Sequence, residues 1–478
     1  MAHRIACALA LGLVMLPWSR SNVPAWGLDS NPPRPNVLLI VSDDQRPDTI
    51  HALGNEFIRT PNLDRLARRG IAFTHAVAPC PICTPSRAEL LSGCTIFHCG
   101  VTNFGGRFKP DLVLWPEAMR RAGYRTWYCG KWHNDGRPST RGYDASRGLF
   151  AGGGRRFARP ATDYRGHPVT GYVGWVFQTD DGKLEPQLGV GLTPHTNRHI
   201  ADAAISFLRE KQTAPFFLHV NFTAPHDPLL PPRNKAHHYD PRTIPLPPNF
   251  APQHPFDHGN LHGRDEELLP FPRTPDIVRA DRAMYYAVIS DLDEQVGRLL
   301  QTLQETGLCD STIVIYTSDH GLAVGSHGLR GKQNMYEHTV GVPLLIAGPG
   351  IPAGRRLEPS VYLRDLYPTI CQWCDVPCPD DLDGKSFASL LHGETKPIHP
   401  FIVGYFRHVQ RMIRTDDWKL IVYPEAGRHQ LFDMRHDRNE CHDRAMEASM
   451  QPHVRRLAAM LRTWQRKHHD PLVVKIAP

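Results

Sequence analysis

The chain has 478 residues, enough for one large domain and a smaller one. With 41% hydrophobic and 22% charged residues, its composition is ordinary for a globular protein. The formal net charge of +7 suits anionic substrates, but the basic residues form no long Lys/Arg block, which argues against nucleic-acid binding.

Residues 1–25 are typical of a secretory signal peptide. A short basic start at residues 3–4 precedes an apolar run at 5–16 that is too short to span a bilayer. Small residues at 23–25 offer a cleavage site, and an uncleaved interfacial anchor is the alternative. No later segment is long and apolar enough for a transmembrane helix, so we expect a secreted or periplasmic protein.

Export would permit disulfide bonds among the nine cysteines other than Cys7, which lies in the signal peptide, and Cys83. Cys94 with Cys99 is one possible pair, and a second pair could form within the group Cys371, Cys374 and Cys378. The sequence does not give the connectivity.

The first predicted strand covers residues 36–41, a continuous apolar run typical of a buried strand in a parallel sheet. Asp43 and Asp44 follow it directly, and ligands bind at the carboxyl ends of strands in open α/β sheets. Two adjacent carboxylates can supply oxygen ligands to a divalent cation. A plain surface turn is the alternative, because Asp is common in turns, but the buried strand and the absence of Gly favour a metal site.

Thr60 and Pro61 predict the start of an amphipathic helix that ends at Gly70, and residues 72–78 predict the next strand. That strand leads to Cys83-Thr84-Pro85-Ser86-Arg87, a segment that continues as a helix to Gly93.

Cys83 is therefore expected at a helix N-terminus, where free N–H groups favour anions and lower the pKa of a thiol. Arg87 adds a fixed positive charge one turn later. Two alternatives are a buried structural thiol and a redox pair formed with Cys80.

A helix at 115–123 precedes a strand from Tyr124 that ends near Lys131 and His133. These two residues are two positions apart and so share a face of the strand. A lysine and a histidine facing an anion would combine a point charge with a general acid or base.

The next strand, at 215–222, ends near His226, and a long amphipathic helix runs from Met284 to Leu303. A strand at 312–316 then ends at Asp319 and His320, a second acidic position at a strand end. Lys332 follows in a Gly-rich loop, and residues 342–347 are expected to be the last core strand. The segments at 150–190 and 228–275 show no clear period, and a second metal site among the histidines of the latter lacks ligand spacing.

Short strands at 401–406, 412–415, 418–423 and 431–434, followed by a helix at about 454–468, predict a small antiparallel subdomain. The fold class is therefore α/β, with a mainly parallel central sheet flanked by helices and a small C-terminal antiparallel α+β subdomain. We place the domain boundaries at 1–25 for the signal, 35–396 for the catalytic domain and 397–478 for the subdomain.

These motifs together resemble the type I sulfatases of the alkaline phosphatase superfamily, over about residues 35–470. The resemblance rests on three motifs. They are Cys-x-Pro-Ser-Arg-x-x-Leu-Leu-x-Gly from Cys83, Gly-Lys-Trp-His at 130–133 and Ala-Pro-His-x-Pro at 224–228. One feature departs from the family pattern, since Asn134-Asp135 replaces a usual Leu-Gly. At Asp319-His320 the family has Asp-Asn or Asp-His, and His is a softer ligand for calcium than Asn.

The resemblance implies that a maturase oxidises Cys83 to Cα-formylglycine, whose hydrate attacks sulfur and later releases sulfate. It implies a Ca²⁺ ion bound by Asp43, Asp44, Asp319, His320 and the modified residue 83. It also implies that Lys131, Lys332 and Arg87 neutralise the sulfate oxygens. We expect His226 to protonate the leaving oxygen and His133 to remove the proton of the second hydroxyl.

We expect the substrate to be a small-molecule or oligosaccharide sulfate ester, and a sulfated carbohydrate in particular. Specificity would come from the loops at 150–190 and 228–275. Their candidate contacts are Arg155, Arg156, Arg159, Trp175, Arg233, His237 and His238.

Several alternatives remain open. Within the family these are a choline or aryl sulfatase, and within the superfamily a phosphatase or phosphodiesterase with an unmodified Thr or Ser. A Cys80/Cys83 oxidoreductase and a non-catalytic sulfoglycan-binding protein are the others.

Overall fold

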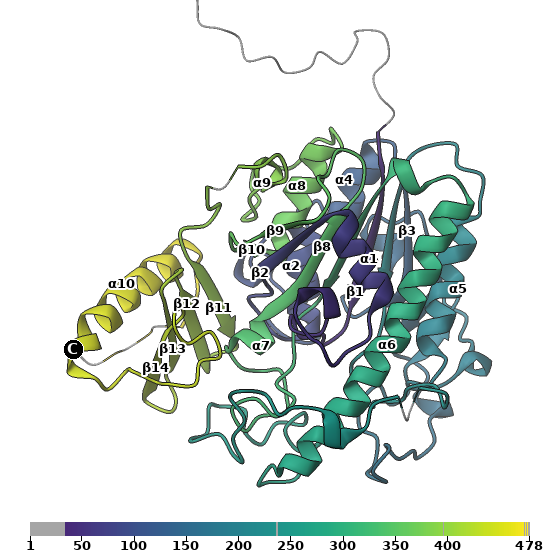
Figure 1. Cartoon of the computed structure of the whole chain (residues 1–478). Coiled ribbons are helices and arrows are strands. Elements are labelled where there is room, and N and C mark those ends of the chain that lie inside the picture. Colours follow the sequence, from purple (N-terminus) through teal and green to yellow (C-terminus); the bar gives the residue numbers. More distant parts are fainter. Residues whose placement is uncertain (1–33, 236–237, 395, 473, 475, 477–478) are drawn as a thin grey trace, which may run out of the picture. The chain divides into compact units, whose positions relative to one another are not determined.

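Figure 1 shows a computed structural model, which describes residues 34–235, 238–394, 396–472, 474 and 476. The predicted signal peptide and His237 lie outside these residues. From Pro35 onward the chain forms one compact unit. Within the described residues, no helix is both long enough and apolar enough to cross a membrane.

The described part of the chain contains one ten-stranded sheet, in which strand order is β10-β2-β8-β7-β1-β6-β3-β4-β5 and β9 pairs with β2. Its strands are β1 (Asn36–Ser42), β2 (Ile71–Val77), β3 (Arg125–Lys131), β4 (Ala145–Ala151), β5 (Val176–Gln178), β6 (Phe216–Asn221), β7 (Thr312–Ser318), β8 (Gly341–Ala347), β9 (Arg355–Leu357) and β10 (Val361–Tyr362). Only the β2–β8, β7–β8 and β4–β5 pairs are antiparallel in this sheet. The prediction of a mainly parallel sheet is confirmed.

The sequence interpretation was incomplete at the edges of this sheet. Residues 342–347 are not its last strand, because the short strands β9 and β10 both pair with β2. Strands β4 and β5 were not predicted, since β4 is interrupted by Gly148 and β5 spans only three residues.

The helices of the described chain are α1 (Pro61–Arg69), α2 (Cys83–Ser92), α3 (Ile96–Cys99), α4 (Trp115–Arg121), α5 (Thr196–Leu208), α6 (Pro275–Glu305), α7 (Glu337–Val340), α8 (Leu366–Trp373), α9 (Ala388–Leu391) and α10 (Gln451–Lys467). Helix α6 begins about two turns before the predicted start, with Pro275 in its first turn and the Thr274 hydroxyl accepting from the Ile277 N–H at 3.4 Å. Thr60 precedes α1, but its side chain does not cap that helix; it accepts from the His51 N–H at 2.9 Å instead.

Strand β1 lies between β7 and β6 and is buried over its whole length. Because side chains alternate along a strand, Leu38 and Ile40 enter one core with residues of α1, α5 and α6. Val37, Leu39 and Val41 enter the opposite core with residues of α2, α4 and α8. Helices α5 and α6 lie side by side on the first of these faces (Figure 1). Burial on both faces explains why the strand is a continuous apolar run.

The C-terminal region forms a separate four-stranded antiparallel sheet, as predicted, in the order β11-β12-β13-β14. Its strands are β11 (Ile402–Phe406), β12 (Gln410–Arg414), β13 (Trp418–Tyr423) and β14 (Arg428–Asp433). Val454, Leu457 and Leu461 of α10 are buried in one core with side chains of this sheet. That helix was also predicted.

Candidate active site

Three acidic side chains meet where β1 and β7 end. The two strands pair in parallel, with Ser42 opposite Ser318, so the residues that follow each strand are neighbours. The Asp44 N–H donates to Asp319 Oδ1 at 3.1 Å, and Asp44 adopts a left-handed backbone conformation with φ 68°. Asp43, Asp44 and Asp319 are buried. The structure therefore brings together the acids that the sequence placed at two strand ends.

These acids belong to a group of five potential metal ligands that also contains Cys83 and His320, with ligand atoms all within 4.8 Å of one another. The Nε2 atom of His320 is buried without a hydrogen-bond partner among the described residues, and it lies 3.7 Å from Asp319 Oδ2. Three carboxylates make an oxygen-rich donor set that suits calcium. The residues present therefore fit a divalent cation.

Burial disfavours the ionised form of two of these acids, and a bound cation would stabilise it. Burial raises the pKa of Asp319 to about 7, although Arg87 opposes this. Burial also raises the pKa of Asp44, against the effects of His226 and Lys332. Buried carboxylates that are costly to ionise would be stabilised as anions by a bound divalent ion.

Cys83 is the first residue of α2, as the sequence predicted, and it is buried beside the acids. Its Sγ lies 3.6 Å from Asp43 Oδ1 and 3.7 Å from Lys332 Nζ. Burial raises the pKa of the Cys83 thiol, but Lys131, Lys332 and His133 outweigh it and hold the pKa well below its usual value. Cys80, in contrast, is a free thiol whose pKa burial raises well above normal, which speaks against a redox pair.

Three cationic side chains surround the acids. Lys131 Nζ lies 2.6 Å from Asp43 Oδ2, and Lys332 Nζ lies 2.9 Å from Asp44 Oδ2. Arg87, one turn after Cys83 in α2, lies 2.9 Å from Asp319 Oδ2. All three predicted anion-binding residues therefore lie in the same buried cluster as the acids.

His226 is fixed in one orientation at the end of β6. Its Nδ1 lies 2.7 Å from the carbonyl oxygen of Asp227, so Nδ1–H donates there and Nε2 is left facing Asp44 Oδ2 at 3.8 Å. Burial lowers the pKa of His226, but the carboxylates of Asp44, Asp227 and Asp43 together outweigh this effect and the net pKa is raised. The ring is therefore suited to carry a proton on Nε2.

His133 lies in a different environment, between two aromatic rings. Phe104 stacks on it with ring centroids 5.3 Å apart, and Trp175 meets it edge-on at 5.0 Å. Burial lowers the pKa of His133, which favours the neutral ring. The path after His133, where the sequence departs from the family pattern, is held by Asn134, which donates to the Thr84 carbonyl at 3.1 Å.

Several residues of the site were not predicted from the sequence. The Tyr172 hydroxyl donates to Asp43, Asn221 accepts from Arg87, and Arg264 pairs with Asp227. Tyr172 and Arg264 come from the loops without clear periodicity, so no local pattern marked them. Asn221 is the last residue of β6, and its position at a strand end was the available signal.

Of the candidate substrate contacts in the loops, only Trp175 is in contact with a predicted catalytic side chain among the described residues. Arg155, Arg156, Arg159, Arg233 and His238 are exposed. Phe104, which was not predicted, stacks on His133 and is 47% exposed to solvent.

The Cys94–Cys99 disulfide that the sequence left possible is not formed in the structure, where both residues are free thiols. The Cys99 thiol donates to the Ile96 carbonyl oxygen within α3 at 3.9 Å, whereas Cys94 lies beside His98 and Asp383. Cys371 and Cys378 also interact as thiols and form no disulfide.

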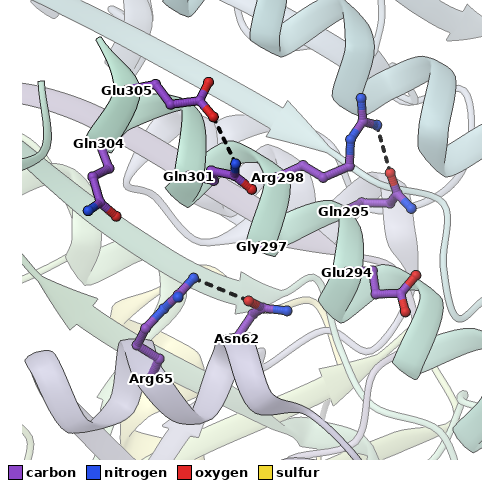
Figure 2. Close-up of a pocket in the computed structure, with 9 residues that line it drawn as sticks. All are labelled: Asn62, Arg65, Glu294, Gln295, Gly297, Arg298, Gln301, Gln304 and Glu305. Atoms are coloured by element: carbon purple, nitrogen blue, oxygen red, sulfur yellow. Dashed lines mark hydrogen bonds between the residues drawn. The ribbon is translucent and has the colours of Figure 1, made fainter. Parts of the chain in front are cut away.

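A separate open pocket of about 840 Å³ lies between α1 and α6. Figure 2 shows Asn62 and Arg65 of α1 facing the polar side chains of α6. Its lining is Asn62, Arg65, Glu294, Gln295, Gly297, Arg298, Gln301, Gln304 and Glu305. None of these residues belongs to the buried cluster around Cys83, and none is a nucleophile of the Ser, Thr or Cys type.

Comparison with known proteins places this arrangement in a family. A sulfatase family profile matches residues 35–376, and the C-terminal region of N-sulphoglucosamine sulphohydrolase matches residues 325–467. An arylsulfatase of Clostridium perfringens is 28% identical over 438 residues, covering 85% of this chain and 89% of its own. An N-acetylglucosamine-6-O-sulfatase of Bacteroides thetaiotaomicron is 26% identical over 508 residues, covering 91% and 87%.

A solved structure supports the same fold. The phosphonate monoester hydrolase of Agrobacterium radiobacter superposes with a TM-score of 0.76 at 24% identity, covering 91% of this chain and 96% of its own. The large sheet between helices and the smaller antiparallel sheet therefore form an alkaline phosphatase-like fold. Because the family profile covers most of the chain, the chain belongs to the type I sulfatases of the alkaline phosphatase superfamily and is a sulfuric ester hydrolase.

Proposed function

We propose that this chain removes sulfate from sulfated carbohydrates, using Cα-formylglycine formed from Cys83 and a bound Ca²⁺ ion. One observation carries the proposal. Cys83 at the start of α2 lies within one buried cluster of acids, lysines and histidines, at 3.6 Å from Asp43 and 3.7 Å from Lys332. A formylglycine-generating maturase would act on Cys83, and export would follow from the segment 1–25.

The ion would be held by Asp43, Asp44, Asp319, His320 and the modified residue 83. When bound, calcium would supply positive charge next to the sulfate oxygens and the attacking hydroxyl. His320 is the unusual member of this set, since calcium prefers oxygen ligands. Its contacts with two of the carboxylates, at 3.5 and 3.7 Å, support a position in the coordination sphere.

Formylglycine at residue 83 would supply a hydrated aldehyde, with one hydroxyl to attack sulfur and a second to allow release of sulfate. Lys131, Lys332 and Arg87 would bind the sulfate oxygens and neutralise the charge that develops on them. Each lysine ammonium has three donors, so a contact with a carboxylate leaves others for sulfate. Arg87 is held by Asp319 and Asn221, which fixes its guanidinium.

The two histidines are suited to opposite roles. His226 has a raised pKa and a free Nε2, so it would hold a proton for the leaving oxygen. His133 has a lowered pKa, so it would accept the proton of the second hydroxyl as sulfate leaves. Environments that separate two pKa values in this way are typical of acid and base pairs.

The carbohydrate assignment rests on the surroundings of the site. Phe104 and Trp175 border His133, and aromatic rings of this kind can stack on sugar rings. The net charge is +5 when Arg4 and Arg20 of the segment 1–25 are subtracted from +7, and it favours polyanions or their fragments over neutral lipids. One relative is named for N-acetylglucosamine 6-O-sulfate, whereas another is named only for aryl sulfates. Aryl and choline sulfates are therefore the alternative substrates.

The metal assignment can be tested by elemental analysis of active protein. We expect calcium in a one-to-one ratio with active enzyme, lost together with activity in an Asp43→Asn, Asp319→Asn double variant. An exposed Asp310→Asn variant is the control and should keep its calcium. Zinc in place of calcium, lost in the double variant, would overturn the assignment of calcium, whereas calcium retained by the double variant would overturn the ligand assignment.

The substrate assignment can be tested by a panel of sulfated mono- and oligosaccharides, aryl sulfates, choline sulfate and a phosphonate monoester. We expect the highest kcat/KM on a glycan. Phe104→Ala should weaken glycan turnover and leave aryl sulfate turnover much less affected. Higher kcat/KM on choline sulfate or an unsubstituted aryl sulfate than on every glycan would contradict the carbohydrate assignment while leaving the sulfatase chemistry intact.

A further inference from the structure

A second cluster of metal-binding side chains lies beyond the other end of α2. Cys94 follows that helix, His98 is in α3, and Asp383 is in the loop before α9. Their ligand atoms all lie within 4.8 Å of one another, and His98 Nδ1 is already 3.2 Å from Asp383 Oδ2. His468, at the end of α10, places Nδ1 3.5 Å from the other carboxylate oxygen of Asp383.

We propose that Cys94, His98 and Asp383 bind a zinc ion, with His468 as the outer partner of Asp383 and water as the fourth ligand. Sulfur, imidazole nitrogen and carboxylate oxygen are the ligands that zinc takes in proteins. Zinc bonds of about 2.0–2.3 Å place tetrahedral ligand atoms roughly 3–4 Å apart, so small side-chain rotations would close this site. A thiolate and an imidazole would disfavour calcium or magnesium here.

The ligands are oriented by further contacts, as in established zinc sites. Cys94 is fully buried. Asp383 Oδ2 also accepts from the N–H and the hydroxyl of Thr95, at 2.8 and 3.0 Å. The His468 ring stacks on Trp464, with centroids 4.4 Å apart. The cluster is therefore built into the fold and is not a chance group of surface side chains.

The position of the cluster indicates a structural role. Cys83 begins α2 and Cys94 lies two residues after its end, so the two clusters are at opposite ends of one helix. Zinc would tie the end of α2 to the loop at Asp383 and, through His468, to the end of α10. A Cys94–Cys99 disulfide would prevent this, since it removes the thiol from the site.

The test uses cobalt and zinc as probes in a Cys83→Ser background, which removes the thiol of the other cluster. We expect the metal-free protein to bind one zinc ion, to melt at a higher temperature with it, and to give a thiolate-to-cobalt charge-transfer band. Adding Cys94→Ser should abolish the band and the zinc-dependent rise in Tm. Adding Cys441→Ser, at an exposed thiol, should change neither.

Two further variants keep the test decisive if Cys94→Ser folds poorly. His98→Ala and Asp383→Asn should each weaken zinc binding at least tenfold, with circular dichroism confirming the fold. An unchanged cobalt band in the Cys94→Ser protein, no zinc binding by the Cys83→Ser protein, or a Cys94–Cys99 disulfide in the purified enzyme would each overturn the proposal.

Discussion

Tyr172 donates its hydroxyl hydrogen to Oδ2 of Asp43, across 129 residues of sequence. The same carboxylate oxygen receives Lys131 Nζ at 2.6 Å, and this ammonium lies 5.2 Å from the centre of the Tyr172 ring. The ring also meets His226 edge-on at 4.7 Å. The loop at 150–190 therefore supplies one side of the catalytic cluster as well as the surface around it.

Replacing Tyr172 with Phe should lower kcat/KM roughly 10- to 100-fold, because a hydrogen bond to a charged group contributes about 1.5–3 kcal/mol. The ring and its packing would remain, so the free energy of unfolding should change little. Tyr164→Phe is the matched control, since Tyr164 lies in the same loop but donates to Asp281. Equal losses of activity in the two variants would show that the hydrogen bond from Tyr172 to Asp43 has no specific effect on activity.

Replacing His226 with Ala should affect substrates according to their leaving groups. Alkoxide leaving groups need a proton and nitrophenolate does not, so turnover of a sulfated sugar should fall roughly 100- to 10,000-fold and that of nitrophenyl sulfate far less. His133→Ala should reduce turnover of both substrates, because its proposed step follows loss of the leaving group. The comparison requires kcat/KM, which reports the steps up to loss of the leaving group, and kcat, which also reports the later release of sulfate, for both variants on both substrates. Equal losses in His226→Ala would assign that residue to binding or structure.

Acid should destabilise the protein through histidines that are buried in the neutral form. Burial lowers the pKa of His254 to about 4 and of His258 and His327 to about 3. These folded-state values lie below the usual 6.5, so the unfolded chain binds more protons between about pH 6.5 and 4. Stability should therefore be complete above pH 6.5 and fall by up to ~1.4 kcal/mol per pH unit for each histidine below it.

Urea unfolding at pH 7.5, 6.5 and 5.5 measures this effect. His258→Asn should reduce the dependence of the unfolding free energy on pH, whereas His436→Asn, at an exposed position, should leave it unchanged. The same pH dependence in the parent protein and in His258→Asn would show that His258 does not contribute to the loss of stability in acid.

The link between α2 and the C-terminal sheet should be important for stability. Glu89 of α2 is buried, pairs with Arg364 at 2.9 Å and accepts from the Tyr405 hydroxyl of β11. Glu89→Ala would leave the Arg364 charge buried and unpaired, so the free energy of unfolding should fall by about 3–5 kcal/mol. Glu117→Ala, which removes a solvent-exposed pair with Arg121, should cost less than about 0.5 kcal/mol. Similar values for both variants would show that the buried pair has no special role.

The sequence could predict those parts of the site that follow buried strands. Asp43, Lys131, His226 and Asp319 each come shortly after an apolar run, and parallel strands bring such positions to one edge of the sheet. Cys83 was predictable because its helix signals are local, with Pro85 in the first turn and Gly93 at the end. These inferences needed no knowledge of contacts distant in sequence.

The remaining parts depend on contacts that no local pattern records. Tyr172 and Arg264 are brought to the site by loops whose path is set by tertiary packing, and they show no period of a helix or strand. The antiparallel pairing of β8 with β2 and β7 was not predictable either, since a fully buried strand is apolar in either direction. The neighbours of Cys94 could not be predicted either. Its spacing in the sequence suggested Cys99 as a partner, whereas the fold places His98 and Asp383 beside it.

The proposed chemistry requires Cα-formylglycine at residue 83 in active enzyme. An intact-peptide mass spectrum of the segment that contains this residue, taken from protein of known specific activity, measures its chemical state. We expect a mass lower than that of the cysteine peptide by the replacement of CH₂SH with CHO, an adduct with a hydrazide, and specific activity proportional to the modified fraction. A free thiol or a Cys80–Cys83 disulfide in fully active enzyme would contradict the proposed chemistry.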